Sequence, residues 1–553
     1  MRFVIAAAAI LSGSTPLFAQ GDQAPQLSIA LAPGAIDQAA GRADLAVVLR
    51  LSDARFAAGD TLFVHQNMAP RMSGPIRIEG LSVVDNDGAV PITDDGQTGQ
   101  RGWRAGRAIS GAVTVRYRVA IDNSTGGILS TTPHVDGAGV FGVGNMLLLI
   151  PRQDGNYRIA LDWDLSALRR GATAISTFGE GDQALPAGPL SRLTYAMFMA
   201  GDVKRVQHDA FGVYWTGAPR FDIAAAATWT GDLYAWMSRF FADPSLPRYS
   251  VFLRENPSAP GNGVAAPYSF VLGYGAATTA EGMKTILGHE MTHSWTANDL
   301  GKWYSEGNAV YYQSRLPWLA GMISTDRYLR DINLTAARYY TNDVIAEPDE
   351  TIVPRFWSDM RYNVLPYDRG AIYFAVLDAR IRAASRGRRS VDDLVRAMVD
   401  RHRRNQPIAA EHWLDLLKRE LGAEGPQLHL AMMRGERLVP PSGAYGPCFR
   451  RVAAKIRRYD LGFGGPEIVR RQIVENLRSD SEAARSGLLD GDRVDYASST
   501  EGAQRDPAQT ITMKVMRGDR TFDVTYLPRG KPVDAYQWVR VPGVPDARCR
   551  LLT

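Results

Sequence analysis

The sequence lacks a strong excess of charge of either sign. Its 63 basic residues stand against 58 acidic ones, for a net charge of +5 over 553 residues. This balance argues against nucleic acid as the main partner, because phosphate-binding proteins usually concentrate basic residues on one face. The hydrophobic fraction of 45% and the charged fraction of 22% are close to the averages for folded proteins, so long disordered tracts are not expected. A chain of this length should form roughly two to four domains.

The sequence also lacks an apolar run long enough to span a membrane. At the N-terminus, Arg2 precedes an apolar stretch over residues 3–11 and a plausible cleavage site before Gln20. The apolar run is broken by Pro16, short of the roughly 20 residues that a membrane-spanning helix needs. Residues 1–19 are therefore predicted to be a cleaved signal peptide, with a buried first strand or a membrane anchor as the alternatives. We expect a soluble periplasmic or secreted protein without a membrane span.

Cysteine is scarce, and both copies lie near the C-terminus. Cys448 and Cys549 would both remain after removal of a signal peptide. In an oxidising compartment they could pair and close a loop of about 100 residues, which the chain-entropy model values at on the order of 4 kcal/mol. The alternative is two independent thiols. We expect the disulfide, because exported proteins seldom keep free thiols.

Three stretches with different residue patterns follow the predicted signal peptide. Residues 20–204 contain short β-type runs between Gly, Asp and Pro, and predict an N-terminal β-sandwich. Residues 205–440 show helical periods with a few strands at their start, and predict a mainly α-helical domain. A Pro- and Gly-rich boundary precedes residues 448–549, where strand-like runs return and predict a small β domain. The expected fold class is multidomain α+β.

The most specific motif is T-I-L-G-H-E-M-T-H-S-W, residues 285–295. His289 and His293 are four residues apart, so on a helix they share one face and can bind one metal ion through neutral imidazoles. Glu290 lies beside them and can take a proton from a metal-bound water and pass it to the leaving amine. The alternative is an ordinary helix that carries two histidines.

A tetrahedral catalytic zinc site needs a third protein ligand and one open position. The stretch W-Y-S-E-G-N-A-V-Y-Y, residues 303–312, supplies Glu306 near the start of a second predicted helix. A short helix–turn–helix connection can bring this carboxylate to the metal. The alternative role for Glu306 is a first-turn residue favoured by the helix dipole.

A third motif, R-Y-N-V-L-P-Y-D-R-G-A-I-Y-F, spans residues 361–374. Tyr367 could donate its hydroxyl hydrogen bond to a developing oxyanion, the kind of preorganised donor that favours hydrolysis. By residue type alone, a tyrosine that precedes a helix is more often a packing residue.

These three motifs, in this order, resemble the glycyl aminopeptidase family of gluzincin metallopeptidases, which is related to zinc aminopeptidases and leukotriene A4 hydrolase. The resemblance implies a thermolysin-like catalytic domain behind an N-terminal β domain, and one zinc ion. It also implies zinc ligation by His289, His293 and Glu306, with Glu290 as the base and Tyr367 as the oxyanion donor.

The C-terminal segment extends this resemblance. D-L-G-F-G-G, residues 460–465, resembles the carboxylate-binding loop of PDZ domains, and residues 481–494 resemble their helix and following turn. A PDZ-like module after the catalytic domain is known in this family. The resemblance implies that Leu461, Gly462 and Phe463 bind peptide C-termini through their amides. The alternative is a module used only for packing.

Two features depart from the family pattern. Twelve residues separate His293 from Glu306, fewer than relatives usually have. Relatives also carry an upstream glutamate that helps to hold the free amino group of the substrate, where this chain has Ala265 and Ala266. Without that carboxylate a charged N-terminus loses an ion-pairing partner, so exo- and endopeptidase action both stay open.

The sequence therefore predicts an exported zinc metallopeptidase that hydrolyses peptide bonds of peptide or protein substrates. Two other classes of function stay open. One is a non-catalytic peptide-binding or chaperone-like protein that uses its PDZ-like domain, against which the intact Glu290 argues. The other is a zinc hydrolase that acts on a non-peptide bond.

Overall fold

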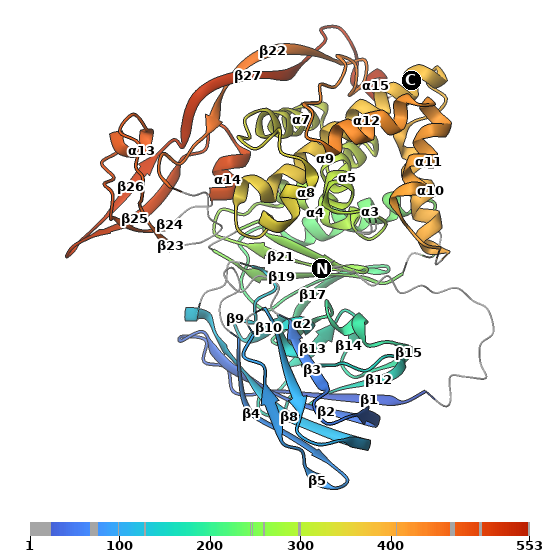
Figure 1. Cartoon of the computed structure of the whole chain (residues 1–553), viewed down its shortest axis with the longest axis vertical. Helices are drawn as coiled ribbons and strands as arrows, with labels where there is room; N and C mark the ends of the chain where they lie inside the picture. Colours follow the sequence, from blue (N-terminus) through green and yellow to red (C-terminus); the bar gives the residue numbers. More distant parts are fainter. Residues whose placement is uncertain are drawn as a thin grey trace. The chain divides into compact units, whose positions relative to one another are not determined.

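The computed structural model describes residues 24–66, 76–97, 99–125, 129–243, 245, 247–257, 260–296, 300–404, 406–464, 471–496 and 500–550. The fold is multidomain α+β with several sheets (Figure 1). The described residues divide into two compact units: those up to 231 with 247–280 form the first, and 232–246 with 281–550 form the second. The predicted signal peptide lies outside the described residues, and the domain boundaries expected from the sequence stay predictions.

The first unit consists mainly of β-sheets. A seven-stranded sheet has the order β15 (Gln183–Pro189), β12 (Asn156–Trp163), β1 (Gln26–Pro33), β2 (Arg42–Phe56), β8 (Ile109–Asp122), β4 (Arg77–Asp85) and β5 (Gly88–Ala89). A four-stranded sheet has the order β11 (Ile150–Pro151), β3 (Thr61–Gln66), β7 (Gln100–Ala105) and β6 (Ile92–Asp94).

Two five-stranded sheets complete this unit. One has the order β14 (Gly179–Glu180), β13 (Thr173–Ser176), β16 (Met197–Gly201), β10 (Gly139–Val143) and β9 (His134–Asp136). The other has the order β17 (Lys204–His208), β18 (Phe211–Trp215), β19 (Tyr249–Glu255), β21 (Ser269–Tyr274) and β20 (Gly263–Ala266). Short helices α2 (Gly144–Leu147), η2 (Asn123–Thr125) and η3 (Leu190–Leu193) connect some of the strands.

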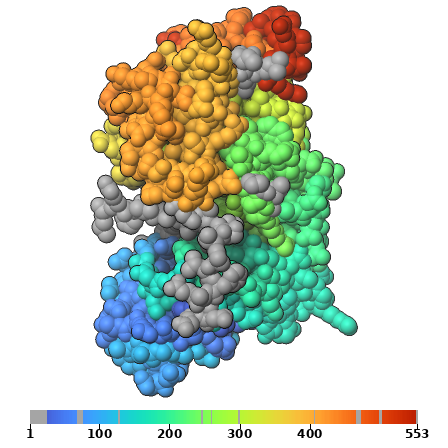
Figure 2. Space-filling model, turned by 90° about the vertical axis from the view of Figure 1, so that its right-hand side faces the viewer, coloured from blue at the N-terminus to red at the C-terminus, as the bar shows by residue number. Residues whose placement is uncertain are grey.

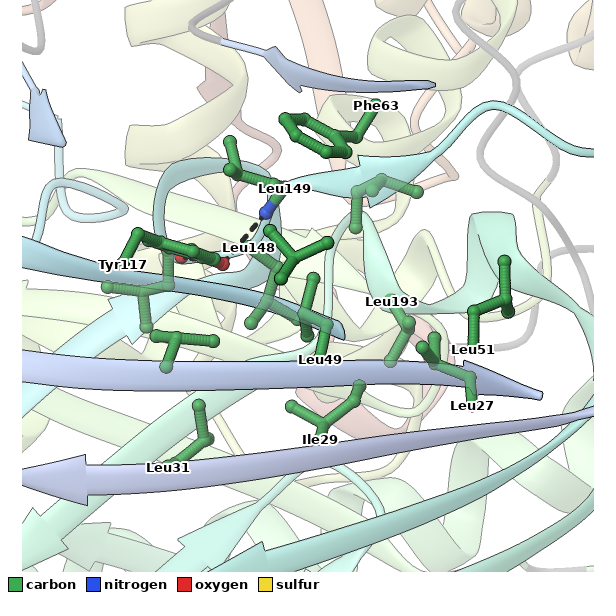
Figure 3. Packing of buried hydrophobic residues seen from close by; sticks show 14 of the residues in the cluster. Leu27, Ile29, Leu31, Leu49, Leu51, Phe63, Tyr117, Leu148, Leu149 and Leu193 are labelled. Carbon is green, nitrogen blue, oxygen red and sulfur yellow. Dashed lines mark hydrogen bonds between the residues drawn. The ribbon is translucent and has the colours of Figure 1, made fainter. Parts of the chain in front are cut away.

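The core of the seven-stranded sheet, called the sheet core below, is built from alternate residues of its strands. Buried residues Leu27, Ile29 and Leu31 of β1 pack with Leu49 and Leu51 of β2 and with residues of the other sheets (Figure 3). One face of each strand is thus removed from water, which is the period-2 pattern that predicts half-buried strands.

The hydroxyl group of Tyr117 lies inside the sheet core and forms two hydrogen bonds there. The Tyr117 hydroxyl donates to the carbonyl of Leu147 at 3.1 Å and accepts from the amide of Leu149 at 2.9 Å (Figure 3). Both backbone groups belong to the connection that crosses the core, so the phenol satisfies them where water cannot reach.

The sheet that contains β10 and β16 is apolar on both faces. Val140 and Ala200 belong to the sheet core, whereas Phe141 and Met199 pack on the opposite face against Phe252 and other residues of the last sheet. A sheet covered on both sides has near-continuous apolar strands, which is why Met197–Gly201 is buried at every position.

The second unit is helical around the candidate site. Its helices are α4 (Ala280–Thr292), α5 (Lys302–Tyr312), α6 (Arg315–Leu319), α7 (Thr325–Tyr340), α8 (Asp349–Ile352), η4 (Val353–Arg355), α9 (Met360–Ser385), α10 (Val391–Arg403), α11 (Ala410–Leu421) and α12 (Glu424–Met433). Helix α3 (Ile223–Phe240) carries residues of both units. Helices α10 to α12 lie side by side on one surface of the unit (orange in Figure 2).

The ends of two of these helices carry residue types that are common at helix ends. Ser390 and Asp393 form a capping box at the start of α10, and Gly422 with a positive φ ends α11. Among the described helices, none combines the length and the apolar character needed to cross a bilayer.

The C-terminal part of the second unit contains a two-stranded and a four-stranded sheet. The long strands β22 (Phe449–Tyr459) and β27 (Arg529–Arg540) pair with each other, and β27 packs against α7. The other sheet has the order β23 (Arg471–Ile473), β24 (Arg493–Tyr496), β25 (Ile511–Arg517) and β26 (Arg520–Tyr526), with short helices α13 (Glu482–Arg485), α14 (Thr500–Arg505) and α15 (Asp546–Cys549) nearby in sequence. Cys448 and Cys549 form a disulfide, which confirms the predicted pairing.

Candidate metal site

The two motif histidines lie at the C-terminal end of α4. His289 is in the last turn of the helix, and His293 follows directly after its final residue, Thr292. The spacing of four still places the rings together, with their Nε2 atoms 3.3 Å apart and their ring centroids 5.0 Å apart. Both Nε2 atoms therefore face the same point.

Glu306 joins the two imidazoles from the middle of α5. Its Oε2 atom lies 3.5 Å from Nε2 of His289 and 3.3 Å from Nε2 of His293. Within the described residues, these three side chains form the group whose donor atoms could hold one metal ion. The short connection between α4 and α5 therefore does not prevent the carboxylate from reaching the histidines.

The spacing of the three donor atoms fits zinc. Nitrogen and oxygen ligands at about 2.0–2.1 Å from a tetrahedral zinc ion lie about 3.3–3.4 Å from one another. The three separations here are 3.3, 3.3 and 3.5 Å. Two imidazoles and one carboxylate leave the fourth position open, which is the donor set of a catalytic rather than a structural zinc site.

A lysine on α5 fixes the orientation of the Glu306 carboxylate. Lys302 Nζ donates to Glu306 Oε1 at 2.9 Å, so the other oxygen, Oε2, is the one that faces the histidines. Burial alone would raise the pKa of Glu306, but the charges of Lys302 and His293 outweigh it and hold this pKa well below its usual value. The carboxylate is therefore ionised and ready to bind a cation through one oxygen.

A glutamine and an aspartate orient the His289 ring through its second nitrogen, Nδ1. Its Nδ1 atom lies 3.2 Å from Oε1 of Gln313, and Nε2 of Gln313 donates to the Asp331 carboxylate at 2.9 and 3.1 Å. Because the Gln313 amide gives its N–H groups to Asp331, its oxygen must accept from Nδ1–H of His289. This tautomer leaves Nε2 of His289 unprotonated for the metal.

Glycine allows the close approach that this chain of bonds requires. A Cβ atom at Gly288 would lie 2.3 Å from the carbonyl oxygen of Gln313. Only glycine at this position lets the end of α5 come close enough for Gln313 to reach the neighbouring His289.

A second close approach brings α9 to α5. A Cβ atom at Gly307 would lie 2.5 Å from the Cα of Gly370, and one at Gly370 would lie 2.2 Å from the carbonyl oxygen of Trp303. Gly307 follows Glu306 directly, and Gly370 is three residues after Tyr367. The contact thus places the Glu306 and Tyr367 segments side by side.

Tyr367 lies inside a helix. The sequence had indicated a position before the start of one. Helix α9 begins at Met360 and contains Pro366 in its interior. The Tyr367 ring stacks on the ring of His289, with centroids 5.9 Å apart and planes 13° apart. Its neighbour Asp368 is buried and bonded to Arg338, which anchors this turn of the helix, with Nε and Oδ1 2.7 Å apart.

Glu290 is buried beside the three donor residues. Burial raises the pKa of its carboxyl group above the usual value, although the charge of Arg505 on α14 acts in the opposite direction. A carboxylate whose pKa is raised by burial is a better proton acceptor than one in water, which is the property that a general base needs. A buried carboxyl group thus lies beside the three donor residues.

The predicted peptide-binding loop of the C-terminal part is partly engaged within the protein. The side chains of Leu461 and Phe463 are buried in the core of the four-stranded sheet. The amide of Gly462 donates to Asp460 Oδ1 at 2.9 Å, and the amide of Gly464 donates to the carbonyl of Glu475. Peptide binding by Leu461, Gly462 and Phe463 stays a prediction.

Sequence reasoning missed Lys302, Gln313 and Asp331. Lys302 could have been found, because it precedes Glu306 by four residues on a helix and an i, i+4 pair shares a face. Gln313 follows the last residue of α5 and Asp331 lies on α7, and no spacing in the sequence signals that they meet.

Comparisons with known proteins find similar structures but no similar sequence among family models or curated proteins. No family model matches the sequence, and no curated protein matches it. A structure of an aminopeptidase N family protein from Idiomarina loihiensis superposes with a TM-score of 0.67 at 15% identity, covering 95% of this chain and 100% of that chain. The structural neighbours are M1 zinc metallopeptidases and related proteins.

Two further neighbours are more distant in structure. An M1 zinc metallopeptidase mutant from Deinococcus radiodurans, bound to a Tyr-Ser-Ala substrate, has a TM-score of 0.45 at 16% identity and covers 76% of this chain and 96% of that chain. Yeast LTA4 hydrolase in complex with bestatin has a TM-score of 0.49 at 12% identity, with 78% and 71% covered. At these identities the likeness concerns the fold.

Proposed function

We propose that this chain is a zinc-dependent metallopeptidase that hydrolyses peptide bonds outside the cytoplasm. The observation that carries the proposal is the convergence of His289 Nε2, His293 Nε2 and Glu306 Oε2 at distances of 3.3–3.5 Å, with Glu290 buried beside them. The disulfide between Cys448 and Cys549 supports an oxidising compartment, and the predicted signal peptide agrees with it.

The roles of the residues follow from their placement. His289, His293 and Glu306 would hold zinc, which when bound polarises the scissile carbonyl and lowers the pKa of a water molecule. Glu290 accepts the proton of the attacking water and delivers it to the leaving amine. Tyr367 donates its hydroxyl hydrogen bond to the oxyanion that develops on the carbonyl, and its stacking on His289 keeps the ring beside the reacting group.

Three further residues would support the metal-binding side chains. Lys302 keeps Glu306 binding through a single oxygen, and the Gln313–Asp331 pair keeps His289 in the tautomer that a metal requires. In this proposal peptides with blocked N-termini are substrates as well, because attack by a metal-activated water does not require the free amino group of the substrate.

The test compares free and N-blocked peptides with the wild type, Glu290→Gln and Tyr367→Phe, together with metal analysis of each protein. Loss of the general base should lower kcat by about 10²–10⁴, and loss of the oxyanion donor by about 10²–10³. Both variants should keep one equivalent of zinc, because neither residue is a donor.

Glu281→Gln is the matched control, since Glu281 lies on the same helix but is exposed and bonded to Arg327. Its turnover should stay within about twofold of the wild type, as expected for a surface change distant from the site. Turnover that survives in Glu290→Gln would exclude the proposed mechanism. Activity that is confined to ester or epoxide substrates would replace peptide hydrolysis by the chemistry of another zinc hydrolase.

A further inference from the structure

A row of aromatic rings leads away from the metal-binding group. The ring of His289 stacks on Tyr367, and Tyr367 stacks on Phe356 with centroids 6.5 Å apart and planes 11° apart. Phe356 in turn contacts the ring of Trp357 edge-to-face, with centroids 4.9 Å apart. The row therefore continues from a proposed metal ligand to the segment between η4 and α9.

The inner members of this row are held in place. Phe356 is only 4% exposed, and the Lys302 ammonium lies 5.5 Å from the centre of its ring. The same ammonium bonds to Glu306, so one lysine ties the ring to the metal-binding carboxylate. The side-chain amide of Asn363 donates to the backbone carbonyl of Phe356 at 3.0 Å, which fixes the segment on α9.

The outer end of the row is exposed. Its last ring, Trp357, is 39% exposed, and Val353, whose carbonyl accepts from the amide of Phe356, is an apolar residue that is 64% exposed. Scattered apolar residues on a surface need no explanation. Here, however, the exposed indole is in ring contact with Phe356, which packs on the residue proposed to bind the oxyanion.

We propose that Val353 and Trp357, with the buried ring of Phe356 behind Trp357, form the binding wall for a large apolar side chain of the substrate, at a position next to the scissile bond. This inference rests on the proposed function and deepens it by naming the substrate class: peptides cleaved beside an aromatic or large aliphatic residue. We infer a substrate side chain as the bound group because the surface adjoins the proposed site. A peptide whose carbonyl contacts Tyr367 extends past Phe356, the ring that stacks on Tyr367. When an apolar side chain of the substrate covers Trp357 and Val353, the apolar surfaces of all three side chains are removed from water, which stabilises the complex.

The experiment measures kcat/KM for two series of N-blocked peptides, in which the residue before or after the scissile bond is Phe, Leu or Ala. The wild type should prefer Phe or Leu over Ala by about tenfold or more in one of the two series. That preference corresponds to the burial of roughly one apolar side chain. Trp357→Ala should lose most of the preference, and the loss should appear as a higher KM for the Phe and Leu peptides.

Leu430→Ala is the matched control, because Leu430 is 48% exposed on α12 and has no part in the aromatic row. This variant should keep the full preference. A binding measurement separates recognition from turnover: Glu290→Gln should bind the Phe peptide more tightly than the Ala peptide, and the additional change Trp357→Ala should abolish the difference.

The outcomes distinguish the two proposals. Hydrolysis that does not depend on Glu290 removes the proposed function. Hydrolysis that depends on Glu290 but shows no preference, or a loss in Trp357→Ala that is equal for Phe and Ala peptides, overturns the apolar wall alone. A dimer in the wild type that Trp357→Ala dissociates would assign this surface to a second copy of the chain and also overturn it.

Discussion

The sheet core of the first unit and the helices around the candidate metal site bury different kinds of residue. The sheet core is a cluster of mainly apolar side chains, in which the phenol of Tyr117 has two hydrogen-bond partners. Around the site, α4 to α10 bury charged groups such as Glu290, Glu306 and Asp368, and the pair of Arg315 and Asp392. The sheet core depends on non-directional burial, whereas the helices depend on bonds between named atoms, so the two regions should respond differently to substitution.

The largest expected effect is the loss of one half of a buried ion pair. Arg315 donates to both oxygens of Asp392 at 3.0 Å, and the Tyr312 hydroxyl adds a third bond at 2.9 Å. Arg315→Met leaves the Asp392 carboxylate buried without its main partner and should cost about 3–5 kcal/mol of unfolding free energy. Urea denaturation of the purified protein measures the loss.

A double variant sharpens this result. Arg315→Met combined with Asp392→Leu removes both charges, and it should recover much of the stability that the single change loses. If the double variant is no more stable than Arg315→Met, the helical region does not depend on the pairing and the contrast with the sheet core fails.

The sheet core should show the opposite pattern. Leu49→Ala removes part of a fully packed side chain and should cost about 3 kcal/mol, while Leu49→Met keeps the volume and should cost less than about 1.5 kcal/mol. Peptide hydrolysis at temperatures below the unfolding transition should be unchanged in both. A loss from Leu49→Met as large as that from Leu49→Ala would contradict non-directional packing.

A smaller effect is expected at the metal site itself. Asp331→Asn weakens the bond that orients Gln313 and, through it, His289, so the zinc dissociation constant should rise by about 10–100-fold. Competition with a chromogenic chelator measures this change without any assay of activity. Asp326→Asn on the same helix is the control, because the Asp326 side chain is 81% exposed. Equal zinc affinities in both variants would show that the bonds behind His289 have no effect on the metal.

The smallest effect concerns pH and an ion pair at the seven-stranded sheet. The hydrogen bond from Arg107 lowers the pKa of Asp85 below its usual value of 3.8. A carboxyl group with a lowered folded-state pKa adds stability that is complete above 3.8 and is lost as the pH falls through the folded-state value. Asp85→Asn should therefore be less stable than the wild type at pH 6, and the difference should shrink below pH 3.8 in pH-dependent thermal melts. A constant difference across that range would contradict the ion pair.

The sequence predicted much of this arrangement where the pattern is local. Residues 113–119 alternate between apolar and polar types as a strand does, and they lie in β8; Ser390 and Asp393 have the spacing of a capping box, and they lie at the start of α10. The spacing of His289 and His293 predicted their convergence, because four residues make about one helical turn. These signals need only the geometry of one element.

Other features could not be predicted because they depend on contacts between elements. The sequence indicated that Tyr367 precedes a helix, whereas α9 begins at Met360, contains Pro366 and packs against α5 through Gly370 and Gly307. The strand Met197–Gly201 is buried on both faces because a second sheet covers it. The bonds from His289 through Gln313 to Asp331 join three helices, and single-sequence patterns contain no trace of such a connection.

The central claim is that two imidazoles and one carboxylate bind a single zinc ion. Anomalous diffraction at the zinc edge, from crystals of protein purified with zinc, tests it most directly. The account predicts one strong peak about 2.0–2.2 Å from Nε2 of His289, Nε2 of His293 and Oε2 of Glu306. A peak bound by other residues, or none between these three side chains at full zinc occupancy, would contradict it.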